Sequence, residues 1–322
     1  MNRLFYGIDQ VVTVKPTGEE RESNPFLEVI AYLSRPCDVY SLLDGAYDES
    51  VVEAGNGISQ YREITSLPPI MHLSVERGQV DRMKCEEPLK LPELIYMDRY
   101  MSTPEILAKR RQAWIGRAQL RILQDKRDTL TKTATGLDIP QTMTSTQDYL
   151  QQIAKNATEL GVDTELIDTP FLEALGSLAA AAHKKIEALN TEIAQYEQKL
   201  NNLFAEDRKL PYRLHAVFMH RSGQGRVDGG HWFIYIYDKK SAQWRRYNDE
   251  TITKVMDPKP FLDPVQGRAR EEGTSSFVVY VREDMADTLV ETVHRVPHEG
   301  AQEVAAAALA VEHEPAPPPG GW

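Results

Sequence analysis

The chain has few of the residues that mark metal sites, secretion or membrane insertion. Its 322 residues include only two cysteines, Cys37 and Cys85, and neither belongs to a Cys-x-x-Cys pair. This excludes a zinc site built on cysteines. No apolar run approaches the roughly 20 residues of a membrane span, and the N-terminus lacks the apolar core of a signal peptide. These absences are typical of a protein of the cytoplasm or nucleus.

Positive charge is also scarce. The chain has 37 Lys and Arg against 48 Asp and Glu, which gives a net charge of −11. An acidic chain is a poor candidate for general nucleic-acid binding, which needs a basic face, but it suits a partner with a basic patch. The hydrophobic fraction of 41% and the charged fraction of 26% are those of an ordinary globular protein.

The residues best suited to chemistry lie in one predicted hairpin. Glycines precede His231, and an alternating strand follows over residues 232–237. After a polar turn, a second strand-like run over residues 244–247 ends in Asn248 and Asp249. Pairing of the two runs would bring Asn248 or Asp249 back beside His231. A histidine oriented in this way is the base half of a nucleophile–base–orienter triad. The alternative is a strand-edge histidine satisfied by a neighbour.

Four strings, in the order LHAVFMHRSG, GGHWFIYIYD, WRRYND and FVVYVRED, resemble the histidine box of the ubiquitin-specific proteases. That family consists of cysteine deubiquitinases with a papain-like fold. The resemblance implies that His231 is the general base, that Asn248 orients it and that Asp249 assists. It also implies four residues that flank the substrate, one of them an aromatic where tyrosine is usual: His220, Gly229, Gly230 and Trp232.

The N-terminal third resembles other parts of the same family. Residues 1–60 indicate strands over 4–14 and 25–33, a polar loop between them, and a short helix that ends in a turn at Gly45. This order resembles the family's fingers region, here without the cysteines that bind zinc in other members. Residues 61–100 resemble two further boxes, and His72 is expected on the exposed face of a strand. The resemblance implies neither a metal nor an organic cofactor.

Residues 102–205 are predicted to be helical. A helix begins near Ser102 and Thr103 and ends near 132. A linker over 133–144 precedes a short helix capped by Ser145, and a third helix spans about 169–205. Its apolar positions alternate in steps of three and four, as in a coiled-coil seam: Leu172, Leu175, Ala179, Ala182, Ile186, Leu189, Ile193, Tyr196, Leu200 and Leu203.

We therefore expect an antiparallel helical arm, inserted into the protease domain and packed on its own first helix. Trp114 is expected to pack on the small residues Ala179 and Ala182. One branch of the family that this chain resembles carries such an arm and uses it for self-association. Packing within one chain and association between chains both remain open.

The expected fold is α+β: a papain-like palm and fingers with antiparallel sheet, a helical arm, and no thumb lobe. The expected parts are the fingers and first part of the palm (1–101), the arm (102–205), the palm with the histidine box (206–290) and a disordered tail (291–322) rich in alanine and proline.

The family's nucleophilic cysteine lies in an N-terminal box, and no Asn-x-Gly-x-x-Cys-like string occurs here. A base without a nucleophile cannot perform acyl transfer, so the chain alone is expected to be inactive and to expose an apolar face. Two functions follow. One is a deubiquitinase that cleaves (iso)peptide bonds at the C-terminal glycine of ubiquitin, represented by its histidine-bearing part. The other is an inactive ubiquitin-binding scaffold assembled through the arm. Ubiquitin and ubiquitinated proteins are the expected partners.

Overall fold

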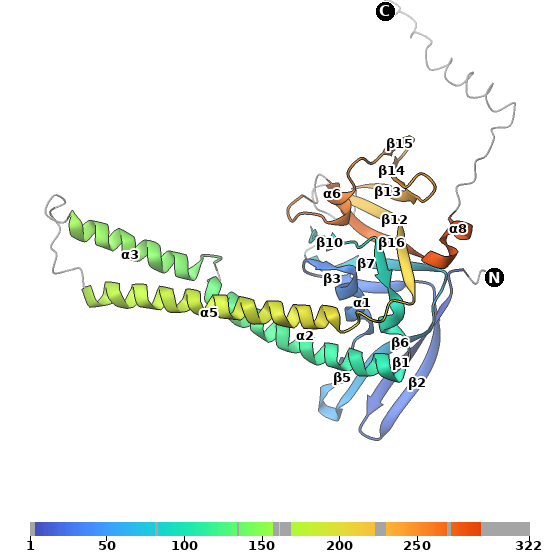
Figure 1. Cartoon of the computed structure of the whole chain (residues 1–322), viewed down its shortest axis with the longest axis horizontal. Helices are drawn as coiled ribbons and strands as arrows, with labels where there is room; N and C mark the ends of the chain where they lie inside the picture. Colours follow the sequence, from blue (N-terminus) through green and yellow to red (C-terminus); the bar gives the residue numbers. More distant parts are fainter. Residues whose placement is uncertain are drawn as a thin grey trace, which may run out of the picture.

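The described residues form two large β-sheets, two short two-stranded sheets and a projecting arm of helices (Figure 1). A computed structural model describes residues 4–80, 83–133, 135–156, 161, 169–222, 230–268 and 272–290. The strands are β1 (Gly7–Lys15), β2 (Gly18–Phe26), β3 (Val29–Leu33), β4 (Cys37–Asp38), β5 (Ser50–Glu53), β6 (Ile58–Ser66), β7 (Ile70–Arg77), β8 (Gln79–Val80), β9 (Met83–Lys84), β10 (Leu89–Lys90), β11 (Leu94–Tyr96), β12 (Pro211–Ser222), β13 (Gly230–Asp238), β14 (Gln243–Asn248), β15 (Thr251–Lys254) and β16 (Thr274–Arg282). The helices are α1 (Val39–Tyr47), α2 (Pro104–Thr131), α3 (Ile139–Lys155), α5 (Thr169–Asn202), α6 (Lys259–Leu262) and α8 (Ala286–Leu289), with short 3₁₀ turns η1 (Ala54–Asn56), η2 (Met97–Tyr100) and η5 (Glu283–Met285).

The smaller sheet has the strand order β2-β1-β6-β5 and is the finger sheet. The prediction of a polar loop after residue 14 is wrong. Instead, β2 pairs with β1 along its whole length, from Lys15 opposite Gly18 to Gly7 opposite Phe26. Most side chains of β2 are exposed. A strand with polar side chains on both faces has no apolar alternation, which is the signal that sequence reasoning needs.

The larger sheet has the order β15-β14-β13-β12-β16-β7-β3 and is the palm sheet. Its pairings are antiparallel except for β3 with β7. The inward side chains of β3, Val29, Ala31 and Leu33, are buried in the same core as Leu43 of α1. The sequence predicted a turn at Gly45, but α1 continues to Tyr47. Burial of the apolar positions on one side of this helix offsets the low helix propensity of the glycine.

The palm sheet is apolar on its other face as well. Ile30 and Tyr32 of β3 are 45% and 79% exposed there, and Phe218 of β12 is 37% exposed. His72, expected at the surface, is instead half-buried between the rings of Phe5 and Phe277, at 5.1 and 5.2 Å. The prediction failed because Phe5 and Phe277, which cover the imidazole of His72, lie far from it in the sequence. The expected exposed apolar side chains therefore lie on β3, at one edge of the palm sheet, and on β12, beside the strand that carries His231.

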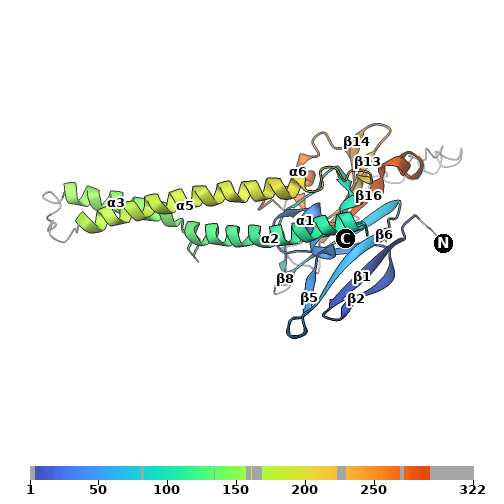
Figure 2. The same ribbon diagram turned by 60° about the horizontal axis from the view of Figure 1, so that its bottom comes forward.

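The arm is formed by α2, α3 and α5, and it extends away from the sheets in both views (Figures 1 and 2). Every position of the predicted seam on α5 is buried or half-buried, while most other positions of this helix are exposed. The helix α2 runs antiparallel to α5, since Ile106 clusters with Phe204 and Leu123 clusters with Leu189 and Ile193. The predicted seam and its intramolecular partner are confirmed.

Two details of the predicted arm are wrong. The middle helix begins at Ile139, six residues before Ser145, because Asp138 caps it by accepting a hydrogen bond from the amide of Gln141 at 2.7 Å. Proline in the first turn supports this start. Trp114 does not pack on the small residues of α5: its indole N–H donates to Asp48, and its ring lies 5.6 Å from that of Tyr61.

The base of the arm is attached to α1 by charged groups. Arg117 of α2 pairs with Asp44 at 2.8 Å and with Asp48, and Arg110 donates to the main-chain carbonyl of Tyr47. Burial, with the repulsion of nearby Asp44, raises the pKa of Asp48 to about 6. The arm therefore meets the body of the protein through polar contacts, while its own interior is an apolar seam. In the described part of the chain, no helix is long and apolar enough to span a membrane.

Candidate active site

The predicted hairpin brings His231 and Asn248 together. Strands β13 and β14 pair in a register that sets Ile234 opposite Tyr247, which leaves His231 near the open end of β13 and Asn248 at the end of β14. The imidazole Nε2–H donates to the side-chain oxygen of Asn248 at 2.5 Å. The expectation that Asn248 or Asp249 returns beside His231 is confirmed, because a hairpin with a short turn fixes its own register.

Asp249 lies in the two-residue turn between β14 and β15 and has a positive φ of 51°. A short polar side chain tolerates this left-handed conformation better than most. Its carboxylate is 3.7 Å from His231 Nε2 and 73% exposed. An exposed carboxylate at that distance is weakly coupled to the imidazole, because water and salt screen it. Asn248 is thus the principal partner of the ring and Asp249 the secondary one.

The contact with Asn248 fixes the chemistry available to His231. When Nε2 carries the proton that is donated to Asn248, Nδ1 holds the free lone pair of the neutral imidazole. The imidazole is stacked on Phe233 with the ring centroids 6.2 Å apart, and the guanidinium of Arg246 lies over the same Phe233 ring, 4.2 Å from its centroid. His231 itself is about one-third exposed. An oriented, accessible imidazole with one nitrogen available can take a proton from a nucleophile and return it to a leaving group.

The residues expected to flank the substrate differ in exposure. Trp232 is 56% exposed, whereas His220 is only 6% exposed and lies under it, with the two ring centroids 4.5 Å apart. Gly230 adopts a φ of +142°, and a Cβ there would lie 2.6 Å from His220 Nε2 and collide with the carbonyl of Arg221. Glycine is therefore required at 230 by close packing on β12. Gly229 lies outside the described residues.

Sequence reasoning missed Lys84. Its ammonium lies 3.0 Å from His220 Nδ1 and 3.3 Å from Ser276 Oγ. Burial, and to a smaller extent the charge of Arg77, lowers the pKa of Lys84 to about 8. The lysine comes from β9, 136 residues before its histidine partner. No local pattern in a charged segment could have indicated that pairing.

Neither cysteine contacts His231. In the described residues the contacts of this imidazole come from Asn248, Asp249 and Phe233. Cys37 is half-buried on β4, and burial with the neighbouring Asp38 raises the pKa of its thiol to about 11. A thiol with a raised pKa is unsuited to be a nucleophile. The described part of the chain also contains no cluster of three or more residues able to hold a metal ion.

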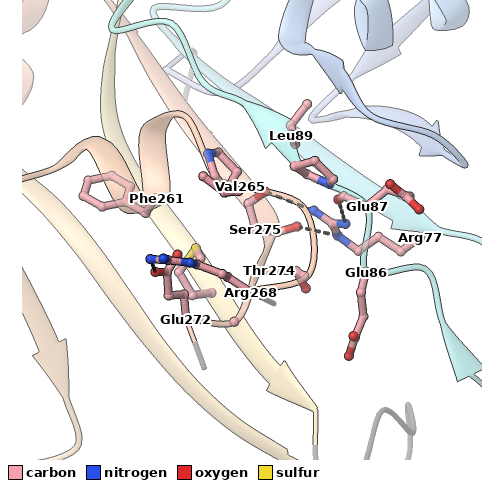
Figure 3. Close-up of a pocket in the computed structure, with 14 residues that line it drawn as sticks. Arg77, Glu86, Glu87, Leu89, Phe261, Val265, Arg268, Glu272, Thr274 and Ser275 are labelled. Carbon is pink, nitrogen blue, oxygen red and sulfur yellow. Dashed lines mark hydrogen bonds and ion pairs between the residues drawn. The ribbon is translucent and has the colours of Figure 1, made fainter. Parts of the chain in front are cut away.

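A small, shallow hollow opens near the end of β12 (Figure 3). Arg77 forms part of its wall and is 7% exposed. Its guanidinium donates to the carbonyls of Ser275 at 2.9 Å and Glu87 at 2.6 Å, as the dashed lines of Figure 3 show. Burial lowers the pKa of Arg77 to about 10. Because the Arg77 guanidinium already donates to main-chain oxygens, it is not available to a ligand. We interpret the hollow as the place where Arg77 connects two segments of the chain.

Comparison with known proteins agrees with the geometry. The family model described as ubiquitin carboxyl-terminal hydrolase matches residues 10–280. The chain is 27% identical over 306 residues to ubiquitin carboxyl-terminal hydrolase 2 of Saccharomyces cerevisiae, which covers 88% of this chain. It is 23% identical over 346 residues to ubiquitin carboxyl-terminal hydrolase 28 of Homo sapiens, covering 79% of this chain. A solved Ubp8-Sgf11-Sgf73-Sus1 SAGA DUB module is similar with a TM-score of 0.46 and 12% identity, over 87% of this chain and 40% of that one.

The chain spans 23% of the length of the yeast relative and 31% of that of the human relative. The family-model match runs from residue 10 to residue 280, a range that includes the hairpin on which His231 meets Asn248. With a palm sheet, a finger sheet and a family match that spans them both, the chain belongs to the ubiquitin carboxyl-terminal hydrolase family.

Proposed function

We propose that this chain is the histidine-bearing part of a thiol-dependent deubiquitinase, which hydrolyses (iso)peptide bonds at the C-terminal glycine of ubiquitin. The observation that carries the proposal is the hydrogen bond from His231 Nε2 to Asn248 at 2.5 Å. It orients the ring and leaves Nδ1 available for a thiol. Membership of the family supplies the reaction class.

In this reaction, a cysteine thiol outside residues 1–322 gives its proton to Nδ1 of His231. The thiolate attacks the carbonyl carbon of the last glycine of ubiquitin, and His231 then returns the proton to the departing amine, which leaves a thioester between the cysteine and that glycine. Water, deprotonated by the same imidazole, hydrolyses the thioester. Asn248 keeps the ring in the Nε2–H tautomer throughout, which is the function of the third group in such triads. Asp249 adds a screened negative charge near the imidazolium.

The strand that carries the base also offers an exposed aromatic surface for the ubiquitin tail. Trp232 follows His231 directly in β13 and is more than half exposed, and Phe218 is partly exposed on the adjacent strand. Because successive side chains of a strand point to opposite faces, both rings lie on the face of the sheet opposite the imidazole, where they would hold an extended peptide at the end of β13. The net charge of −11 favours a partner with a basic tail.

A titration of isotope-labelled ubiquitin with this chain tests the partner. We expect chemical-shift changes in the C-terminal tail of ubiquitin, and weaker changes with the Trp232→Ala variant. Tyr149→Ala, which also removes an exposed aromatic ring but on the distal arm, is the matched control and should bind like the parent chain. Absence of any shift change at saturating chain concentration would contradict ubiquitin as the partner.

A second function concerns the arm. Phe171 and Leu178 are 54% and 55% exposed and lie seven residues apart on the same face of α5, and Tyr149 of α3 is 63% exposed. Exposed apolar side chains that repeat at helical spacing favour a partner helix, so the proposal includes self-association through the distal arm. Sedimentation of the chain should show a dimer that Leu178→Glu dissociates, while Glu197→Gln on the exposed surface near the arm base leaves it intact. A monomer at all concentrations would exclude this assembly.

A further inference from the structure

The segment between β7 and β10 is organised around one buried cation. Arg77 donates from Nη1 to the main-chain carbonyls of Cys85 and Glu87, at 3.2 and 2.6 Å, and from Nε to the carbonyl of Ser275 at 2.9 Å. A planar guanidinium with fixed donor directions imposes a conformation on the main chain that it binds. Residues 84–87 are therefore held against the start of β16.

Main-chain anchoring at residues 85 and 87 directs the side chains of the alternate residues toward β12. Lys84 contacts His220 Nδ1 at 3.0 Å, and Glu86 accepts a hydrogen bond from the hydroxyl of Ser222 at 3.2 Å. One short segment thus holds two positions of β12 that are themselves two residues apart. This spacing matches the period of side chains on one face of a strand.

The two held positions of β12 are the direct partners of the residues on either side of His231. His220 is paired with Trp232 and Ser222 with Gly230, while Arg221 is paired with His231 itself. The ring of His220 is also covered by Trp232 at 4.5 Å. Any displacement of His220 or Ser222 would therefore move the backbone on both sides of the imidazole.

We propose that Lys84 is a positioning residue for His231, which acts through His220 and the β12–β13 pairing and has no contact with the substrate. This inference rests on the proposed function of His231 as the base, and it assigns His220 a buried supporting role under Trp232. Lys84 donates to Nδ1 of His220, which sets that ring in the Nε2–H tautomer. The ammonium also donates to Ser276, so it links β9, β12 and β16 at one point.

We expect the fold to tolerate replacement of this lysine. Burial lowers the pKa of Lys84 to about 8, which means that the charged form is disfavoured in the folded protein. A group with a depressed pKa contributes stability above its unfolded pKa, and this contribution is lost as the pH falls through about 8. An apolar side chain of similar length should therefore be tolerated at pH 7, as buried charges often are when replaced. The effect of Lys84 on the position of His231 can therefore be measured separately from its effect on the stability of the fold.

The test is long-range ¹H–¹⁵N spectroscopy of the histidine side chains in the whole chain, with thermal unfolding measured in parallel. In the parent chain we expect His231 and His220 each as a single Nε2–H tautomer. In Lys84→Met the melting temperature should be unchanged or higher, while His220 becomes a mixture of tautomers and the His231 signals shift and broaden. Lys84→Gln, whose amide can still donate to Nδ1, should restore the parent spectrum of His231. Lys240→Met, on the exposed hairpin turn, should alter neither histidine.

Unchanged His231 signals in Lys84→Met, together with altered His220 signals, would overturn the proposal, because the contact would be lost without effect on the base. Failure of Lys84→Gln to restore His231 would also overturn it. Failure of the proposed function gives a different result: His231 of the parent chain would lack the Nε2–H tautomer, irrespective of any substitution at Lys84.

Discussion

In the arm, side chains are buried against neighbours that follow from helical periodicity, whereas at the end of the palm sheet they are held by partners more than a hundred residues away. Leu189 of α5 packs on Leu123 of α2 in an apolar seam. Lys84 reaches His220 across 136 residues of sequence, and Arg77 reaches Ser275 across 198. A seam can absorb many conservative apolar changes. A polar network with directional bonds loses its geometry when one member is removed.

The largest expected effect is at the sheet end. In the complete protein, Asn248→Ala should lower kcat for a ubiquitin C-terminal amide by about 10²- to 10⁴-fold, because the imidazole loses the group that fixes its tautomer. Thermal stability should change little, since Asn248 is near the rim of the sheet. Asn190→Ala, on the exposed surface of α5, is the control and should keep full activity. Equal turnover by both variants would show that the hairpin does not orient the base.

The next effect is expected in the arm seam. Leu189 is 3% exposed, so Leu189→Ala should destabilise the arm by about 2–5 kcal/mol through lost burial and a cavity. Leu178 is 55% exposed on the same helix. Replacing it by alanine should lower the free energy of unfolding of the monomer by less than about 0.5 kcal/mol. Hydrogen exchange should become faster in α2 and α5 after Leu189→Ala and stay unchanged in β12 and β13. Faster exchange in both regions would mean that arm and sheet unfold as one unit.

The stability of the contact between the arm and the body, at Asp48, should depend on pH. The raised pKa of Asp48, about 6, means that this carboxyl contributes stability below its unfolded pKa of about 3.8 and loses it as the pH rises through about 6. The stability difference between Asp48→Asn and the parent should therefore shift in favour of the variant by up to about 3 kcal/mol between pH 4 and pH 7.5. Asp148→Asn, on the exposed side of α3, should show no such trend. A pH-independent difference for Asp48→Asn would contradict a buried, strained carboxyl at the arm base.

The smallest expected effect is at the start of the arm. Thr103 caps α2 by accepting a hydrogen bond from the amide of Ile106 at 3.3 Å. Thr103→Ala should lower the free energy of unfolding by about 1 kcal/mol, while Thr103→Ser keeps the hydroxyl and should lower it by less. Chemical denaturation with both variants measures the difference. Equal losses for alanine and serine would assign the effect to packing of the threonine methyl group.

How much the sequence could predict depends on how far apart in sequence the contacting residues lie. The seam of α5 and the hairpin with His231 and Asn248 depend on short-range patterns, so both were predicted correctly. The position of Trp114 was predicted wrongly, because its partners are Asp48, which follows α1, and Tyr61 of β6. The strand β2 was missed for lack of an apolar face. Lys84 was missed because its function depends on a contact that exists only once the sheet has formed.

The complete protein with His231→Ala provides the most direct test of the central claim, when turnover of a ubiquitin C-terminal amide and affinity for ubiquitin are both measured. Since we propose that His231 is the base and not a major binding group, turnover should fall by about 10³-fold or more, while the Kd for ubiquitin stays within about twofold. His183→Ala, on the exposed surface of α5, should leave both quantities unchanged. Unchanged turnover in His231→Ala would contradict the assignment of this residue as the base.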